Sequence, residues 1–173
     1  MKRKALKLVI PFMLLTGVVG CESSVIDEDH AIVSVEDAKN EDIYVGNLFK
    51  LEKEFQDVAK SLSTVGLEGT TTDSEKEQFE EKVKKLKSVT AEIRRLTPKS
   101  NYKDTHKEVS KATKLLDKSF DKQSDAIKKE DSTKLKEAIK DMNRATIEFV
   151  KSVDETNDIY MKEIEELAKT IGK

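Results

Sequence analysis

The spacing of apolar residues is the feature that most restricts how this chain can fold. Between residues 41 and 65, six apolar residues follow one another at steps of three and four positions: Leu48, Leu51, Phe55, Val58, Leu62 and Val65. Such steps place side chains on one face of an α-helix, as at the a and d positions of a coiled coil. A half-buried strand would need apolar residues at alternate positions, and residues 41–173 show no such alternation. The spacing therefore predicts a helix over 41–65.

The same spacing recurs in three later segments and predicts helices over 74–96, 102–129 and 132–171. Their apolar seams contain, in order, Phe79, Val83, Leu86, Val89 or Thr90, Ile93 and Leu96; Tyr102, His106, Val109, Thr113, Leu116, Phe120 and Ile127; and Leu135, Ile139, Met142, Thr146, Phe149, Val153, Thr156, Tyr160, Ile164, Leu167 and Ile171. Breaking signals separate the segments: a run of glycines and threonines at 66–72, Pro98, and a polar turn at 130–132. Asp73 or Ser74 is the expected N-cap of the second helix.

Four helices with short connections favour antiparallel neighbours, so we expect an all-α, antiparallel up-and-down helical bundle over 41–173. At about 1.5 Å per residue, the first three helices would be about 35–42 Å long and the fourth about 60 Å. The fourth helix must therefore extend past the others or break. Five consecutive polar residues at 154–158 mark the expected break. With an even number of helices, both ends of the bundle domain would lie at the same pole.

Residues 1–20 have the pattern of a secretory signal peptide that is removed from the mature chain. Four positive residues come first: Lys2, Arg3, Lys4 and Lys7. The apolar stretch that follows, residues 8–19, is short for a permanent membrane-spanning helix, which needs about 20 residues. The alternative is a retained anchor helix.

The chain's only cysteine, Cys21, directly follows this stretch and the residues Val18, Val19 and Gly20. This tetrapeptide resembles the lipobox of bacterial lipoproteins, with Val18 where leucine is commonest in that family. The resemblance implies that signal peptidase II recognises Val18 to Gly20, cuts before Cys21, and leaves a lipid such as palmitate attached there. The alternative is an incidental thiol after an ordinary signal peptide. Two or three acyl chains would anchor the protein durably.

Residues 21–40 are expected to be the acylated cysteine and a flexible acidic stalk. Residues 22–42 hold eight acidic residues and one lysine, a net charge of −7, whereas residues 43–173 sum to +1. An anionic membrane surface would repel this stalk, which would hold the domain away from the lipid. The whole chain has 32 Lys plus Arg and 34 Asp plus Glu, and this balance argues against nucleic acid as a partner.

The end of the fourth helix is the candidate partner surface, because the shorter helices cannot cover its seam residues Tyr160, Ile164, Leu167 and Ile171. A lone amphipathic segment of this length is marginal in water. Three groups could bury these side chains: the apolar run at 31–35 in the stalk, a second copy of the protein, or a partner at the membrane. The run at 31–35 is the nearest, since both ends share one pole, and we expect the stalk and the fourth helix to meet there. An external partner would compete for that surface.

No residue set in the sequence matches a catalytic, cofactor-binding or metal-binding motif. One cysteine excludes an intramolecular disulfide and zinc sites of the CxxC type. His106, near Tyr102 and Asp104, is the one acid–base candidate, but a seam histidine is expected to make a structural hydrogen bond. His30 lies in the stalk. We expect no cofactor, no metal and no enzymatic activity.

Signal, lipobox, acidic stalk and a domain rich in Lys and Glu together resemble small helical lipoproteins of unknown function from Gram-positive bacteria. The joint from Leu96, Thr97 and Pro98 to Tyr102 and His106 is similar to a helix–Pro–helix joint in several of them. The resemblance implies a non-enzymatic binding or structural module, lipid-anchored on the outer face of the cell membrane, with an unidentified envelope protein as partner and self-association open. The alternative is a phage- or plasmid-type exclusion or immunity lipoprotein, and the third is an enzyme acting on envelope polymers.

Overall fold

The computed structural model describes residues 42–63 and 72–171, which form four α-helices and one short 3-10 helix. The elements are α1 (Asp42–Ser63), α2 (Asp73–Arg95), η3 (Ser100–Tyr102), α3 (Lys103–Lys128) and α4 (Ser132–Ile171). The all-α prediction is confirmed for this part of the chain, and each helix begins and ends within two residues of its predicted bounds. The signal segment, Cys21 and the stalk lie outside the described residues.

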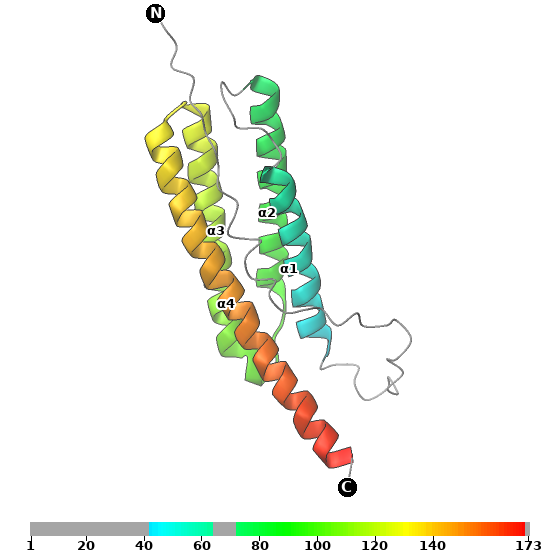
Figure 1. Ribbon diagram of the computed structural model, residues 1–173. Coiled ribbons are helices and arrows are strands. Elements are labelled where there is room, and N and C mark those ends of the chain that lie inside the picture. The colour runs from blue at the N-terminus through cyan, green and yellow to red at the C-terminus, as the bar shows by residue number, and fades with distance from the viewer. Residues whose placement is uncertain (1–41, 64–71, 172–173) are drawn as a thin grey trace, which may run out of the picture.

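The four α-helices form an antiparallel up-and-down bundle, as predicted (Figure 1). Successive helices run in opposite directions and pack against each other, and α1 also contacts α4. α1 begins and α4 ends at the lower pole in Figure 1, where α4 extends well past the other helices. The start of α1 and the projecting end of α4 therefore lie at the same end of the bundle.

The start of α2 is fixed by Thr72, one residue before the predicted caps Asp73 and Ser74. The Thr72 hydroxyl accepts a hydrogen bond from the backbone N–H of Glu75 at 3.3 Å, and the Glu75 carboxylate accepts one from the Thr72 backbone N–H at 2.6 Å. This reciprocal capping box satisfies two N–H groups that would otherwise lack partners. The predicted cap was wrong by one residue, because Glu75 stands three positions after Thr72, the spacing that a capping box requires.

The predicted turn between α3 and α4 is confirmed at residues 129–131. Glu130 has a φ of 53°, and the backbone N–H groups of Glu130 and Asp131 donate to the carbonyls of Ile127 and Ala126. This pattern is a Schellman motif, which ends a helix with one left-handed residue. Asp131 then caps α4 by accepting the N–H of Lys134 at 3.1 Å.

The predicted seams form one core. Most seam residues of α1, α2 and α3 are buried, and so are those of α4 up to Thr156, except Thr146, which is half-buried. Leu51 and Leu96 are only partly buried at its edge. Three residues that the seams omitted are also buried in α1, namely Tyr44, Val45 and Ala59.

α3 and α4 pack more closely than any other pair of helices. Both carry small buried residues at intervals of seven: Ala112, Ser119 and Ala126 on α3, and Ala138, Ala145 and Ser152 on α4. Seven residues are two helical turns, so each set lies in one row along its helix. Small side chains in facing rows let two helix axes approach closely.

α4 is continuous from Ser132 to Ile171, so of the two alternatives the fourth helix extends past the others, and it does not break at 154–158. Thr156 is fully buried, and its hydroxyl donates to the carbonyl of Ser152 at 3.0 Å within the same helix. On the exposed side, Lys151 and Glu155 form an ion pair of 3.7 Å one turn apart. Thr156 and Glu155 therefore find partners one turn earlier in the same helix, and the buried seam continues to Thr156.

Candidate functional site

The candidate site is the pole at which α4 leaves the bundle. Pro98 follows α2 and η3 precedes α3, and this connection buries the ring of Tyr102. The Tyr102 hydroxyl and the Asn101 side-chain amide both donate hydrogen bonds to the carboxylate of Glu163 on α4. These two bonds fix α4 to η3 just before the helix passes beyond the other helices.

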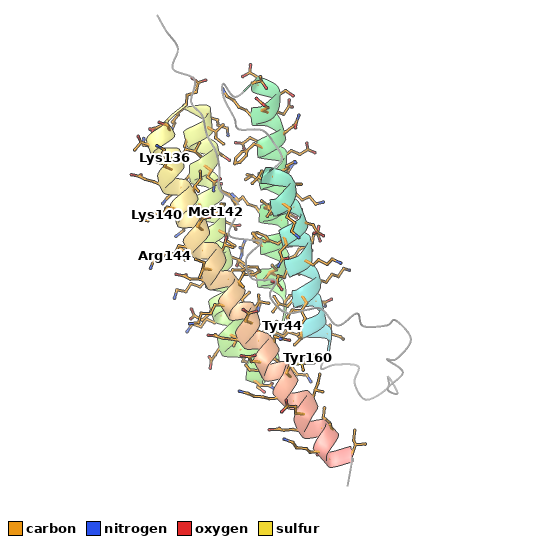
Figure 2. The ribbon with its side chains drawn as sticks, viewed as in Figure 1. Tyr44, Lys136, Lys140, Met142, Arg144 and Tyr160 are labelled. Atoms are coloured by element: carbon orange, nitrogen blue, oxygen red, sulfur yellow. The ribbon has the colours of Figure 1, made fainter. Side chains whose placement is uncertain are left out.

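Beyond this attachment the apolar residues of α4 become exposed. Tyr160 is half-buried and packs partly against the core, whereas Ile164, Leu167 and Ile171 are 41%, 53% and 80% exposed. The structure thus places three of the four predicted surface residues in solvent and sets Tyr160 at the edge of the core. Figure 2 shows Tyr160 and Tyr44 near the pole where α1 begins.

Charge divides α4 into two halves. Residues 132–151 carry five basic and three acidic side chains, whereas residues 152–171 carry two basic and six acidic ones. The basic residues Lys136, Lys140 and Arg144 lie on the outer side of the first half (Figure 2).

The acidic half of α4 meets a further carboxyl group from α1. Burial, followed by the charge of Asp154, raises the pKa of Glu52. Burial and the charge of Asp158 likewise raise the pKa of Asp154. Carboxyl groups of α1 and of the second half of α4 therefore lie near one another.

The acid–base candidate His106 lies in a cluster of aromatic rings at this pole. Its Nδ1 is hydrogen-bonded to the hydroxyl of Tyr44 at 3.1 Å, and its Nε2 lies 3.4 Å from the hydroxyl of Ser110. The Tyr44 ring centre is 5.4 Å from that of Tyr102 and 5.5 Å from that of His106. His106 is therefore hydrogen-bonded to Tyr44 of α1. Tyr102, which lies four positions before His106 in the sequence, is hydrogen-bonded to Glu163 instead.

The ionisation of this cluster favours neutral groups. Burial lowers the pKa of His106 below its usual value of 6.5, and a hydrogen bond with the backbone of Arg94 opposes the shift. Burial raises the pKa of Tyr44 to about 12, against a smaller opposing effect of a hydrogen bond with Thr156. Asp104 is exposed. A neutral, buried and hydrogen-bonded imidazole is suited to joining α1 to α3.

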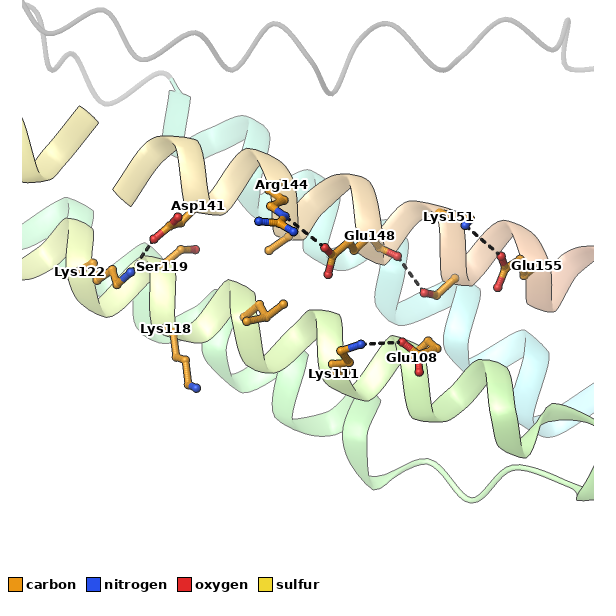
Figure 3. Close-up of a pocket in the computed structure, with 13 residues that line it drawn as sticks. Glu108, Lys111, Lys118, Ser119, Lys122, Asp141, Arg144, Glu148, Lys151 and Glu155 are labelled. Carbon is orange, nitrogen blue, oxygen red and sulfur yellow. Dashed lines mark hydrogen bonds and ion pairs between the residues drawn. The ribbon is translucent and has the colours of Figure 1, made fainter. Parts of the chain in front are cut away.

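A groove of about 610 Å³ runs along the outer side of the α3–α4 pair (Figure 3). Its floor includes Ser119 and Ala145, so the close packing of the two helices forms it. Its rim is lined by ion pairs: Lys111 with Glu108, Lys122 with Asp141, Arg144 with Glu148, and Lys151 with Glu155. Because acids and bases alternate along this rim, the groove has no strong preference for either charge.

Two further observations concern the described residues alone. No three His, Cys, Asp or Glu side chains in this part of the chain lie together so as to hold a metal ion. None of its helices has a stretch that is long and apolar enough to cross a membrane. Val18, Val19, Gly20, Cys21 and the apolar run at 31–35 lie outside the described residues.

Sequence reasoning missed two contributors to this pole. Tyr44 stands four positions before Leu48, so extending the first seam by one step would have found it. Met161, 47% exposed, lies beside the seam residue Tyr160 and widens the apolar face. Met161 would have been identified if the positions next to the seam had been included in the predicted surface.

Residues 33–153 match the protein family described as a domain of unknown function (DUF7018). No curated protein and no solved structure matches the chain. The match includes α1, α2, η3, α3 and the first half of α4, and the exposed end of α4 lies beyond it. Because the match covers well over half of the chain, this protein belongs to the DUF7018 family.

Proposed function

We propose that the protein is a lipoprotein, anchored through Cys21 to the outer face of a Gram-positive bacterial membrane, and that its helical domain is a non-enzymatic binding module. The observation that carries this proposal is the position of the single cysteine, directly after Gly20 and the apolar stretch 8–19. A signal peptide alone requires no cysteine at this point, whereas lipid attachment does.

The arrangement of the bundle supports the proposal. α1 begins at the pole where the apolar end of α4 is exposed. A tether that joins Cys21 to α1 therefore enters the domain beside this surface. The surface would then face proteins that lie close to the membrane, and its apolar side chains suit a protein partner.

The test is metabolic labelling with a palmitate analogue in a Gram-positive host. Wild-type protein should be labelled, and Cys21→Ser should remain an unlabelled precursor because it lacks the thiol that accepts the lipid. Ser24→Ala, a nearby change that keeps the cysteine, is the matched control and should be labelled like wild type. Equal labelling of wild type and Cys21→Ser would reject the lipid anchor.

A further inference from the structure

The end of α4 carries an apolar face whose larger part is exposed. We call it the α4-end face, and it consists of Tyr160, Met161, Ile164, Leu167, Ala168 and Ile171. Tyr160 packs partly against the core, whereas the other five residues are exposed. A continuous apolar face of this kind on a soluble helix marks a site of association.

The direction of this face restricts what can cover it. It continues the seam of Phe149, Val153 and Thr156, which points into the bundle. Among the described residues, the space beside it lies just beyond the pole where α1 begins (Figure 1). A second α4 running in the same direction would place its preceding turns where the other helices stand. A second α4 running in the opposite direction would keep its own bundle clear.

The spacing of the face fits this opposite direction. Tyr160, Ile164, Leu167 and Ile171 follow one another at steps of four, three and four, which read the same from either end. A reversed copy therefore places Ile164 opposite Leu167 of the partner, and Tyr160 opposite Ile171. We propose that the α4-end face binds the same face of a second copy of this chain, with the two helices antiparallel about a two-fold axis.

The charges beside the face are compatible with this pairing. In the heptad that places Ile164 and Ile171 at a, the flanking e and g positions hold Met161, Glu163, Ala168 and Thr170. Glu163 is already bonded to Tyr102 and Asn101. The other charged residues of this segment, Asp158, Lys162, Glu165, Glu166 and Lys169, fall at the outer b, c and f positions. Two copies therefore meet through nearly uncharged surfaces.

Charge disfavours the stalk as the cover of this face. The run at 31–35 is flanked by acidic residues, at 27–29 and at 36–37, and the segment 22–42 carries −7. A second copy brings two lysines and three glutamates in residues 160–171, a net charge of −1. Of these two covers, the second copy therefore brings less negative charge against the face.

The contact would be small and hence weak in dilute solution. It involves six side chains from each copy, against about 20–30 residues a side in a standard protein interface. If the proposed anchor holds, confinement to one membrane raises the local concentration and favours the pair. The pairing itself does not require acylation, so it can be tested separately from the anchor.

Cysteine crosslinking in membranes tests the pairing. Two differently tagged full-length chains, Ile164→Cys and Leu167→Cys, are co-expressed with Cys21 retained, so that the proposed anchor is intact and Cys21 is the same in the test pair and in the control pair. The matched control is the pair Lys162→Cys and Lys169→Cys, which has the same centre of symmetry but lies on the outer side of α4. All four positions are exposed, so the bundle should keep its fold.

Oxidation should yield about tenfold more mixed disulfide between positions 164 and 167 than in the control pair, since a disulfide needs Cα atoms within about 7 Å. The mixed product should also exceed the dimers of either variant with itself. Equal yields for both pairs, dominance of the same-residue dimers, or absence of dimers would overturn the proposal. Preferred closure of a disulfide within one Val33→Cys, Leu167→Cys chain would assign the face to the stalk.

Discussion

Gln123 is fully buried on α3 with its amide only partly satisfied. Its Nε2 donates to the sulfur of Met142 at 3.1 Å, and its Oε1 has no hydrogen-bond partner. A buried polar atom without a partner costs about 1–3 kcal/mol, whereas an apolar group of the same shape avoids this cost. We expect Gln123→Met to raise the free energy of unfolding by about 1 kcal/mol, as measured by urea denaturation.

Gln78→Met is the matched control, because Gln78 is exposed on α2. It should change the free energy of unfolding by less than about 0.5 kcal/mol. A loss of stability in Gln123→Met alone would mean that the buried amide is fully satisfied, for instance by an internal water.

His106 should make stability depend on pH. Its pKa in the folded protein is below 6.5, so at mildly acidic pH the unfolded chain binds a proton that the folded protein does not. The free energy of unfolding should therefore fall as the pH decreases below about 6.5, by at most about 1.4 kcal/mol per pH unit.

Denaturation of wild type and His106→Gln between pH 7.5 and 5.5 checks this prediction, since glutamine can still bond to Tyr44. The raised pKa values of Glu52 and Asp154 act in the opposite direction at lower pH, and they cancel when the two proteins are compared. If the two pH profiles run parallel, His106 is not the titrating group.

At the scale of residues, large apolar side chains were predictable and polar interior ones were less so. Steps of three and four located Leu48, Phe79, Leu116 and Phe149, because only one helical face can reach the core. Spacing also places Gln123 on the stripe of the third helix, four positions before Ile127. Its unpaired Oε1 could not be predicted, because that depends on which groups the neighbouring helices bring against it.

At the scale of elements, the close approach of α3 and α4 depends on the two rows of small residues. Ala145 is 1% exposed and lies in the row on α4. Replacing it with leucine would force the helices apart or distort side chains, and overpacking costs typically about 1–3 kcal/mol. We expect Ala145→Leu to lose that much stability in thermal or urea unfolding.

Ile147→Leu is the matched control on the same helix, because Ile147 is 60% exposed. It should leave the free energy of unfolding nearly unchanged. Equal effects of the two substitutions would show that the row of small residues does not limit the distance between the helices.

The bounds of the helices were predictable because proline, glycine runs and capping residues end helices locally. The continuity of α4 through 154–158 was harder to predict, because composition alone suggested that five polar residues in a row would end the helix. In the structure, Thr156 bonds to its own helix and stays in the seam, which composition does not reveal. The close pairing of α3 and α4 was visible at intervals of seven, but only when Ala and Ser are counted with the apolar residues.

At the scale of the whole molecule, four antiparallel helices of unequal length do not cover the end of α4 with any other helix of the described residues. The topology and the overhang followed from the number and lengths of the helices. The cover of the overhang could not be predicted, because it depends on groups outside the bundle. The attachment of Glu163 to Tyr102 and Asn101 likewise depends on how η3 folds back toward α4.

The central claim is that this bundle is held at a membrane by a lipid on Cys21. The most direct measurement is the intact mass, with N-terminal fragment masses, of the protein purified from bacterial membranes. We predict a chain that begins at Cys21 and carries a diacylglyceryl group, with or without a further acyl chain on the new N-terminus. A chain that keeps residues 1–20, or one with an unmodified Cys21, would contradict the account.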